Sequence, residues 1–127
     1  MKTLSFLLFV LISTYQVNSQ VIWTNKTKLK GSVGKYPINM TLAMPYGGGS
    51  TCITVGEYCY LSNKRQIELC SEDGERIVEQ VNGTETGFFI LEDWDKKIGQ
   101  TVLGTWYSMD ETKKFPVTLK VISKSNN

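Results

Sequence analysis

Apolar and polar residues alternate with a period of two along most of this chain. The alternation is clearest in 38–44, 66–70 and 117–121, where every second residue is aliphatic or Met. Runs with this period are typical of β-strands that have one buried and one solvent-facing side. Apolar residues do not recur at helical spacing between capping residues, so we expect strands rather than helices.

Turn-forming residues separate these runs at short intervals. Asp73-Gly74 and Asn82-Gly83 are strong hairpin signals, because the central residues of a type I′ turn need positive φ. The sequence predicts about eight strands, at 22–30, 34–44, 51–61, 65–70, 75–81, 84–92, 98–108 and 114–122. We therefore expect an all-β fold, an antiparallel up-and-down meander that forms a small barrel or a flattened sandwich.

A glycine is followed two residues later by an aromatic residue at four places, namely Gly34-Lys35-Tyr36, Gly56-Glu57-Tyr58, Gly87-Phe88-Phe89 and Gly104-Thr105-Trp106. A glycine inside a strand permits a bend or bulge, and an aromatic ring can cover the resulting gap. We favour this structural interpretation over a box of aromatic rings that stacks on a ligand.

The N-terminus has the pattern of a secretory signal peptide. Lys2 precedes an apolar block at 4–12, and Val17 and Ser19 suit a cleavage site before Gln20. The block is only about half of the roughly 20 apolar residues that span a membrane. We expect a signal peptide at 1–19, one domain at 20–127, no membrane span, and a secreted product, or a periplasmic one in a bacterium.

The net charge of +2 is too small to indicate a nucleic-acid partner. Charge is nevertheless unevenly distributed, since 68–95 contains nine acidic residues and one arginine. Such a segment either orients an encounter with a charged partner or forms ordinary solvated turns, and the second is commoner.

All three cysteines follow the expected signal peptide and so face an oxidising compartment. In a hairpin of the two predicted strands, Cys59 and Cys70 point to the same face, whereas Cys52 has the opposite parity. This predicts a Cys59–Cys70 disulfide and a free Cys52, an assignment that a register slip or a bulge would undo.

Three sequons follow the expected signal peptide, at Asn25, Asn39 and Asn82. They are candidate glycan acceptors in a eukaryotic secretory pathway, and each would then lie at the surface. Asn39 is the weakest of the three because it falls in a predicted strand.

The chain contains no histidine, which excludes Ser-His-Asp and Cys-His catalysis and imidazole zinc sites. Glu92 and Asp95 could share a calcium ion, but Lys96 and Lys97 would oppose a cation there. We therefore predict no catalytic, cofactor-binding or metal-binding residue, and no enzyme. The candidate contacts to an extracellular protein or glycan are the aromatic residues expected in loops or at strand ends, which are Trp23, Tyr46, Trp94 and Tyr107.

Several motifs together resemble a group of small exported β-meander proteins, many of them bacterial, whose function is not established. They read GKYPINMTL at 34–42, GEYCY at 56–60, IEL at 67–69, TGFF at 86–89, GTW at 104–106 and FPVTL at 115–119. The resemblance covers about 30–121 and implies architecture, with no catalytic residue. A looser similarity is to the periplasmic and secreted lysozyme inhibitors, whose short inhibitory loop would correspond here to 45–50 or 62–65.

These observations favour a secreted, non-enzymatic binding protein, with inhibition of an extracellular hydrolase as one form of that function. The alternative is a carrier of a small apolar ligand in a calycin-like barrel, which needs a cavity of about 300 Å³ or more. A closed barrel of about eight strands leaves little interior space once its side chains are packed. A hydrolase that uses carboxylates alone is the least favoured hypothesis.

Overall fold

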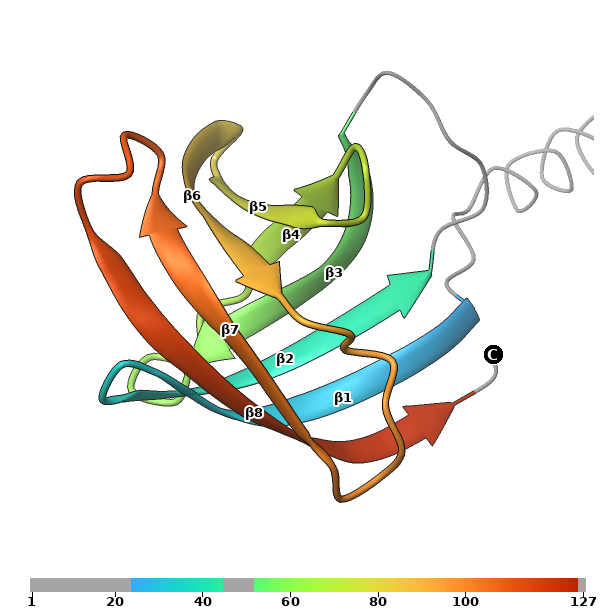
Figure 1. The fold of residues 1–127 in the computed structure, drawn as a ribbon. Helices are drawn as coiled ribbons and strands as arrows, with labels where there is room; N and C mark the ends of the chain where they lie inside the picture. Colours follow the sequence, from blue (N-terminus) through green and yellow to red (C-terminus); the bar gives the residue numbers. More distant parts are fainter. Residues whose placement is uncertain (1–23, 45–51, 126–127) are drawn as a thin grey trace, which may run out of the picture.

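Eight antiparallel strands form a closed barrel in which each strand pairs with its neighbours in sequence and β8 pairs with β1 (Figure 1). The computed structural model describes residues 24–44 and 52–125. Its strands are β1 (Thr24–Val33), β2 (Tyr36–Met44), β3 (Ile53–Tyr60), β4 (Ile67–Ser71), β5 (Arg76–Val81), β6 (Thr84–Leu91), β7 (Thr101–Ser108) and β8 (Lys114–Ser125). The predicted all-β meander is confirmed, and it closes as a barrel.

The two ends of the barrel are built differently (Figure 1). At one end, called the hairpin end below, four short turns join β1 to β2, β3 to β4, β5 to β6 and β7 to β8. At the other, called the pocket end, lie the 72–75 turn, the 92–100 connection, the start of β1 and the end of β8. Asn82 and Gly83 have φ of 53° and 78°, as expected for their hairpin turn.

The inward-facing residues form one apolar core along the barrel. Its members follow the predicted alternation except in β3, where Val55 and Tyr58 lie on either side of a register shift. The most deeply buried include Leu29, Ile38, Met40, Leu42, Tyr58, Leu69, Phe89, Val102, Val117, Leu119 and Val121. A second, smaller cluster lies on the outside, where Cys70, Val78 and Phe88 pack with Cys52, Tyr107 and Met109.

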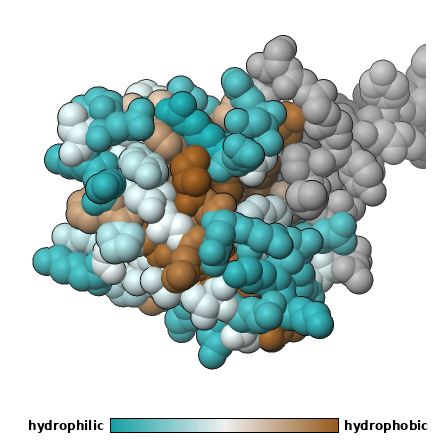
Figure 2. Space-filling view, in the orientation of Figure 1, coloured by the Kyte–Doolittle hydropathy of each residue, from teal (hydrophilic) through white to brown (hydrophobic). Residues whose placement is uncertain are grey.

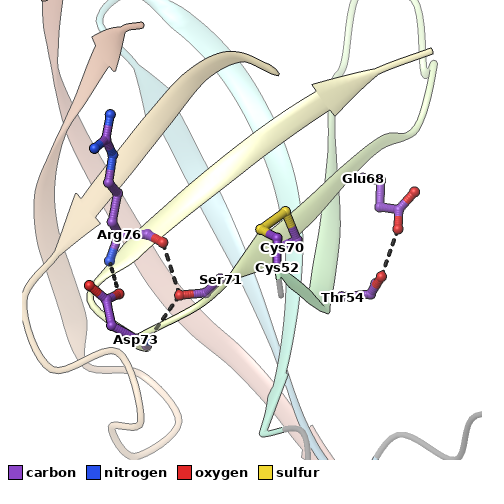
Figure 3. Close-up of a disulfide and its surroundings, with 8 residues drawn as sticks. Cys52, Thr54, Glu68, Cys70, Ser71, Asp73 and Arg76 are labelled. Atoms are coloured by element: carbon purple, nitrogen blue, oxygen red, sulfur yellow. Dashed lines mark hydrogen bonds between the residues drawn. A yellow bond between two sulfur atoms is a disulfide. The ribbon is translucent and has the colours of Figure 1, made fainter. Parts of the chain in front are cut away.

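The disulfide joins Cys52 to Cys70, and Cys59 is a buried free thiol, so the predicted Cys59–Cys70 pairing is wrong (Figure 3). A register shift between Thr54 and Gly56 reverses the parity of β3 before that point. Thr54 consequently lies opposite Cys70. Cys52, two residues before Thr54, points to the same outward side and is bonded to Cys70. Cys59 is five residues further along β3 than Thr54, about 16 Å at strand spacing.

Glycine allows close approaches in the barrel wall, as at Gly56 and Gly87. A Cβ on Gly56 would lie 2.0 Å from the Thr41 carbonyl oxygen, and one on Gly87 would lie 2.4 Å from the Trp106 ring. The ring beside Gly87 thus comes from the neighbouring strand. Gly34 lies in the β1–β2 turn with φ of 58°, not inside the strand predicted over 34–44.

The expected signal peptide at 1–19 lies outside the described residues. In 24–44 and 52–125, no helix has the length and apolarity that a membrane crossing by a helix requires. The Cys52–Cys70 disulfide is consistent with an oxidising compartment.

Candidate functional site

A pocket of about 410 Å³ lies at the pocket end of the barrel. Its floor includes Leu42, Val55 and Ile77, which also belong to the barrel core. Ile53 and Trp94 complete its apolar lining, and Trp94 is half-buried against the core. The side chains that fill the middle of the barrel therefore leave a hollow where β2, β3 and β5 reach this end. The hollow is open at this end, and the middle of the barrel is filled by the core.

Acidic residues from two connections form the rim of this pocket. The 72–75 turn contributes Glu72, Asp73 and Glu75, and the 92–100 connection contributes Asp93 and Asp95. No lysine or arginine of 24–44 or 52–125 lines the pocket. An apolar floor with a rim of one sign of charge is suited to binding a ligand by burial and by electrostatic attraction.

Hydrogen bonds within the 72–75 turn hold its acidic residues at the rim (Figure 3). The Ser71 hydroxyl accepts the Gly74 N–H at 2.8 Å and donates to the Arg76 carbonyl at 2.9 Å. Asp73 Oδ1 accepts the N–H groups of Arg76 and Glu75 at 3.0 and 2.9 Å. These bonds lower the pKa of Asp73 below its ordinary value and keep it ionised.

The 92–100 connection is held by its own carboxylates. Glu92 Oε1 accepts the Leu103 N–H and the Lys96 ammonium, both at 3.0 Å, and these bonds lower the pKa of Glu92. Asp95 pairs with Lys124 at 2.5 Å. Glu92 and Asp95, weighed above as calcium ligands, thus each bind a lysine. No group of three or more Cys, Asp or Glu side chains in the described part of the chain could hold a metal ion.

A second group of polar residues lies inside the hairpin end. Glu79 is only 6% exposed, and its carboxylate accepts hydrogen bonds from three side chains. Tyr58 Oη donates at 2.6 Å, Trp106 Nε1 at 2.7 Å and Thr86 Oγ1 at 2.5 Å. Burial and the neighbouring Glu79 carboxylate raise the pKa of Tyr58, and burial raises that of Tyr60. The network satisfies the buried groups and closes this end of the barrel.

The four aromatic residues predicted to contact a partner do not form one surface. Trp94 lines the pocket. Tyr107 stacks on Phe88 on the outside of the barrel, with ring centroids 5.1 Å apart. Trp23 and Tyr46 lie outside the described residues.

Among the described residues, neither the three sequons nor the 62–65 segment contributes to the lining of the pocket. Asn25, Asn39 and Asn82 are all exposed, which leaves each accessible to a glycan. The 62–65 segment is an exposed turn at the hairpin end, where the Asn63 side chain accepts the Arg65 N–H at 3.0 Å. The 45–50 loop falls outside the described residues.

Sequence reasoning missed both the pocket and the Glu79 network. Glu79 had a readable signal, because it shares a strand face with Ile77 and alternation assigns that face to the core. The acidic excess of 68–95 was noticed, and all five rim carboxylates come from that segment. The sequence pattern does not show that these carboxylates lie beside the floor residues, because this depends on how the strands assemble into the barrel.

Figure 2, drawn in the orientation of Figure 1, shows hydrophobic residues near the middle of the visible face and hydrophilic residues around them. No protein-family model, curated protein or solved structure matches the chain. The geometry of the barrel and its pocket is therefore the basis for assigning a function.

Proposed function

We propose that this chain is an exported, non-enzymatic binding protein whose pocket takes a small ligand with a mainly apolar body. The observation that carries the proposal is the hollow of about 410 Å³ above Leu42, Val55 and Ile77. Ligand pockets typically measure about 300–1,000 Å³ and combine apolar walls with a few polar groups. The described pocket has that size and composition, which supports the carrier hypothesis over a barrel that works only through its outer surface.

The state of the rim acids favours binding over hydrolysis. A glycosidase needs one carboxylic acid that stays protonated near neutral pH, which requires a raised pKa. Asp73 has its pKa lowered by backbone hydrogen bonds, so it is suited to a fixed negative charge. Asp95 is paired with Lys124. Asp73 can therefore hold a positive group of a ligand but is not prepared to donate a proton.

Export is the second part of the proposal. The Cys52–Cys70 disulfide suits an oxidising compartment, and three exposed sequons suit a secreted glycoprotein. Mass spectrometry of the protein isolated from its native source tests this part. We expect a chain that begins near Gln20 and glycan masses at Asn25 and Asn82. An intact N-terminus would contradict export.

Ligand binding can be tested with the neutral fluorescent probe N-phenyl-1-naphthylamine and the chain from residue 20 onward. Ile53→Trp fills the pocket and Trp94→Ala removes a wall, so each should weaken binding about tenfold, equivalent to about 1.4 kcal/mol. Tyr36→Ala is the matched control, because Tyr36 is an exposed aromatic residue at the hairpin end. Equal affinities in the parent protein and the three variants would contradict the proposal.

Inhibition of an extracellular hydrolase stays a prediction from the sequence. It is tested by adding the protein to lysozymes and secreted proteases. Unchanged rates with all of them would remove this hypothesis without affecting ligand binding.

A further inference from the structure

We propose that the ligand of the pocket is an amphipathic cation, with an apolar body on the pocket floor and an ammonium or guanidinium group at the acidic rim. This inference rests on the proposed function and adds the chemical class of the ligand. Among the described residues, five with carboxylate side chains and none with a basic side chain line the pocket, so this rim has a charge opposite to that of the proposed head group.

Three basic side chains, those of Arg76, Lys96 and Lys124, have other partners. The Arg76 guanidinium lies over the Phe88 ring, 3.8 Å from its centroid, in the outer cluster of the barrel. Lys96 binds Glu92 at 3.0 Å, and Lys124 binds Asp95 at 2.5 Å. Of the five rim carboxylates, only that of Asp95 is in an ion pair among the described residues. The rim therefore keeps most of its negative charge.

The 72–75 turn contributes three of the five rim carboxylates, and two of these, Glu72 and Asp73, also border a second hollow that Arg76 lines. Lys96 and Lys97 line a separate hollow together with Asp93 and Asp95, on the other side of the 92–100 connection. These lysines reduce the net charge near that part of the rim. No interaction within the described residues involves the carboxylates of Glu72 and Glu75, and Asp73 is held ionised by its turn. A cationic head group would consequently be held mainly by the 72–75 turn.

The apolar floor distinguishes this site from a purely acidic surface. Ile53, Val55, Ile77 and Trp94 provide contacts for a hydrocarbon body, and each methylene buried there strengthens binding. A hydrophilic cation gains none of this, and an anion of the same shape would meet like charges at the rim. A cleft of one charge sign with low-dielectric walls strengthens that discrimination. Both a hydrocarbon body and a positive head group are therefore needed for full affinity.

The test compares n-octylammonium, n-octanol and n-octanoate, which share one hydrocarbon chain. Calorimetric titration of the chain from residue 20 onward, at low ionic strength, should give affinities in that order. We expect the cation to bind about tenfold or more tighter than the anion. Added salt at about 0.5 M should shrink this ratio by screening, with little effect on octanol.

The variant Glu72→Gln/Glu75→Gln keeps the size of both side chains and removes two charges. It should lower the octylammonium affinity about threefold to tenfold and leave the octanol affinity unchanged. The matched control is Glu85→Gln/Glu111→Gln, which removes two exposed acids elsewhere on the barrel and should leave both affinities unchanged. An equal loss in the two double variants would overturn the role of the rim.

The failures of the two proposals are distinguishable. If all three octyl compounds bind equally and Trp94→Ala weakens all three, ligand binding stands and the cation inference is wrong. If none binds, and N-phenyl-1-naphthylamine does not bind either, the proposed function itself fails. A dimer in sedimentation that Ile53→Trp abolishes would assign the pocket to a second copy of the chain and overturn the cation inference.

Discussion

Carboxylates occupy both ends of this barrel, but their surroundings are opposite. At the hairpin end, Glu79 is buried and accepts hydrogen bonds from Tyr58, Trp106 and Thr86. At the pocket end, Glu72 and Glu75 are exposed beside an apolar hollow and have no partner among the described residues. A buried polar group is tolerated only when its hydrogen bonds are made, whereas water satisfies an exposed one until a ligand replaces it.

This contrast separates structural acids from ligand-binding acids. Satisfied polar networks make a single core arrangement rigid, which suits the closed hairpin end. Unpaired charges beside an apolar surface give little stability and remain available for binding. Substitutions at the hairpin end should therefore change stability more than affinity, and those at the pocket rim should do the reverse.

The largest effect is expected from Glu79→Ala. The substitution leaves the Tyr58 hydroxyl and the Trp106 N–H without an acceptor in the interior, and each such group costs about 1–3 kcal/mol. Urea unfolding should show a loss of about 3 kcal/mol or more. Glu85→Ala, an exposed acid of the adjacent strand, should change stability by less than about 0.5 kcal/mol. Similar losses in both variants would remove the contrast between the ends.

Removing the Cys52–Cys70 disulfide tests how much it contributes to stability and to ligand binding at the pocket end. Its cysteines are 18 residues apart, and closing a loop of that size contributes about 3 kcal/mol by restricting the unfolded chain. Cys52→Ala/Cys70→Ala should lose about that much, and pocket affinity should also fall because Ile53 adjoins Cys52. Cys59→Ala should lose about 1 kcal/mol. A larger loss for Cys59→Ala than for the double variant would contradict the pairing.

Gly87→Ala should destabilise the hairpin end by about 1–3 kcal/mol, the usual cost of overpacking. The new methyl group would lie 2.4 Å from Trp106 Cζ2, so the indole must move away from Glu79. Combining it with Trp106→Phe, which shortens the ring, should cost less than the sum of the single changes. Additive losses of unfolding free energy in urea would show that the new methyl group and the Trp106 ring do not clash.

The smallest effect concerns pH and the 72–75 turn. The folded-state pKa of Asp73 is lowered, so its contribution to stability is present above the ordinary value of 3.8 and is lost as pH falls through the folded value. Asp73→Asn should therefore be slightly less stable than the parent protein at neutral pH. This difference should vanish below the folded pKa. Glu111→Gln serves as the control in the same urea series, and a difference that persists in strong acid would refute the linkage.

Strand positions were predictable because alternation is a local property. The runs at 66–70 and 117–121 define their inward and outward faces without reference to the rest of the chain. The disulfide was mispredicted because the bulge near Val55 reverses the parity of β3; Gly56 marked a place where a bulge was possible, but a glycine alone does not show that the register shifts there. The pocket floor was not predictable, since Leu42, Val55 and Ile77 come from three strands, and which of their residues meet at one end depends on the pairing register and curvature of the sheet.

Two tryptophans report separately on the two ends, and their indole N–H signals provide the most direct test. In a nitrogen-15 NMR titration with n-octylammonium, the Trp94 signal should shift with saturation, because Trp94 lines the pocket. The Trp106 signal should stay in place, since its N–H is bound to the buried Glu79 carboxylate. Trp94→Phe and Trp106→Phe assign the signals. A shift of Trp106 with an unmoved Trp94 would contradict the assignment of ligand binding to the pocket end.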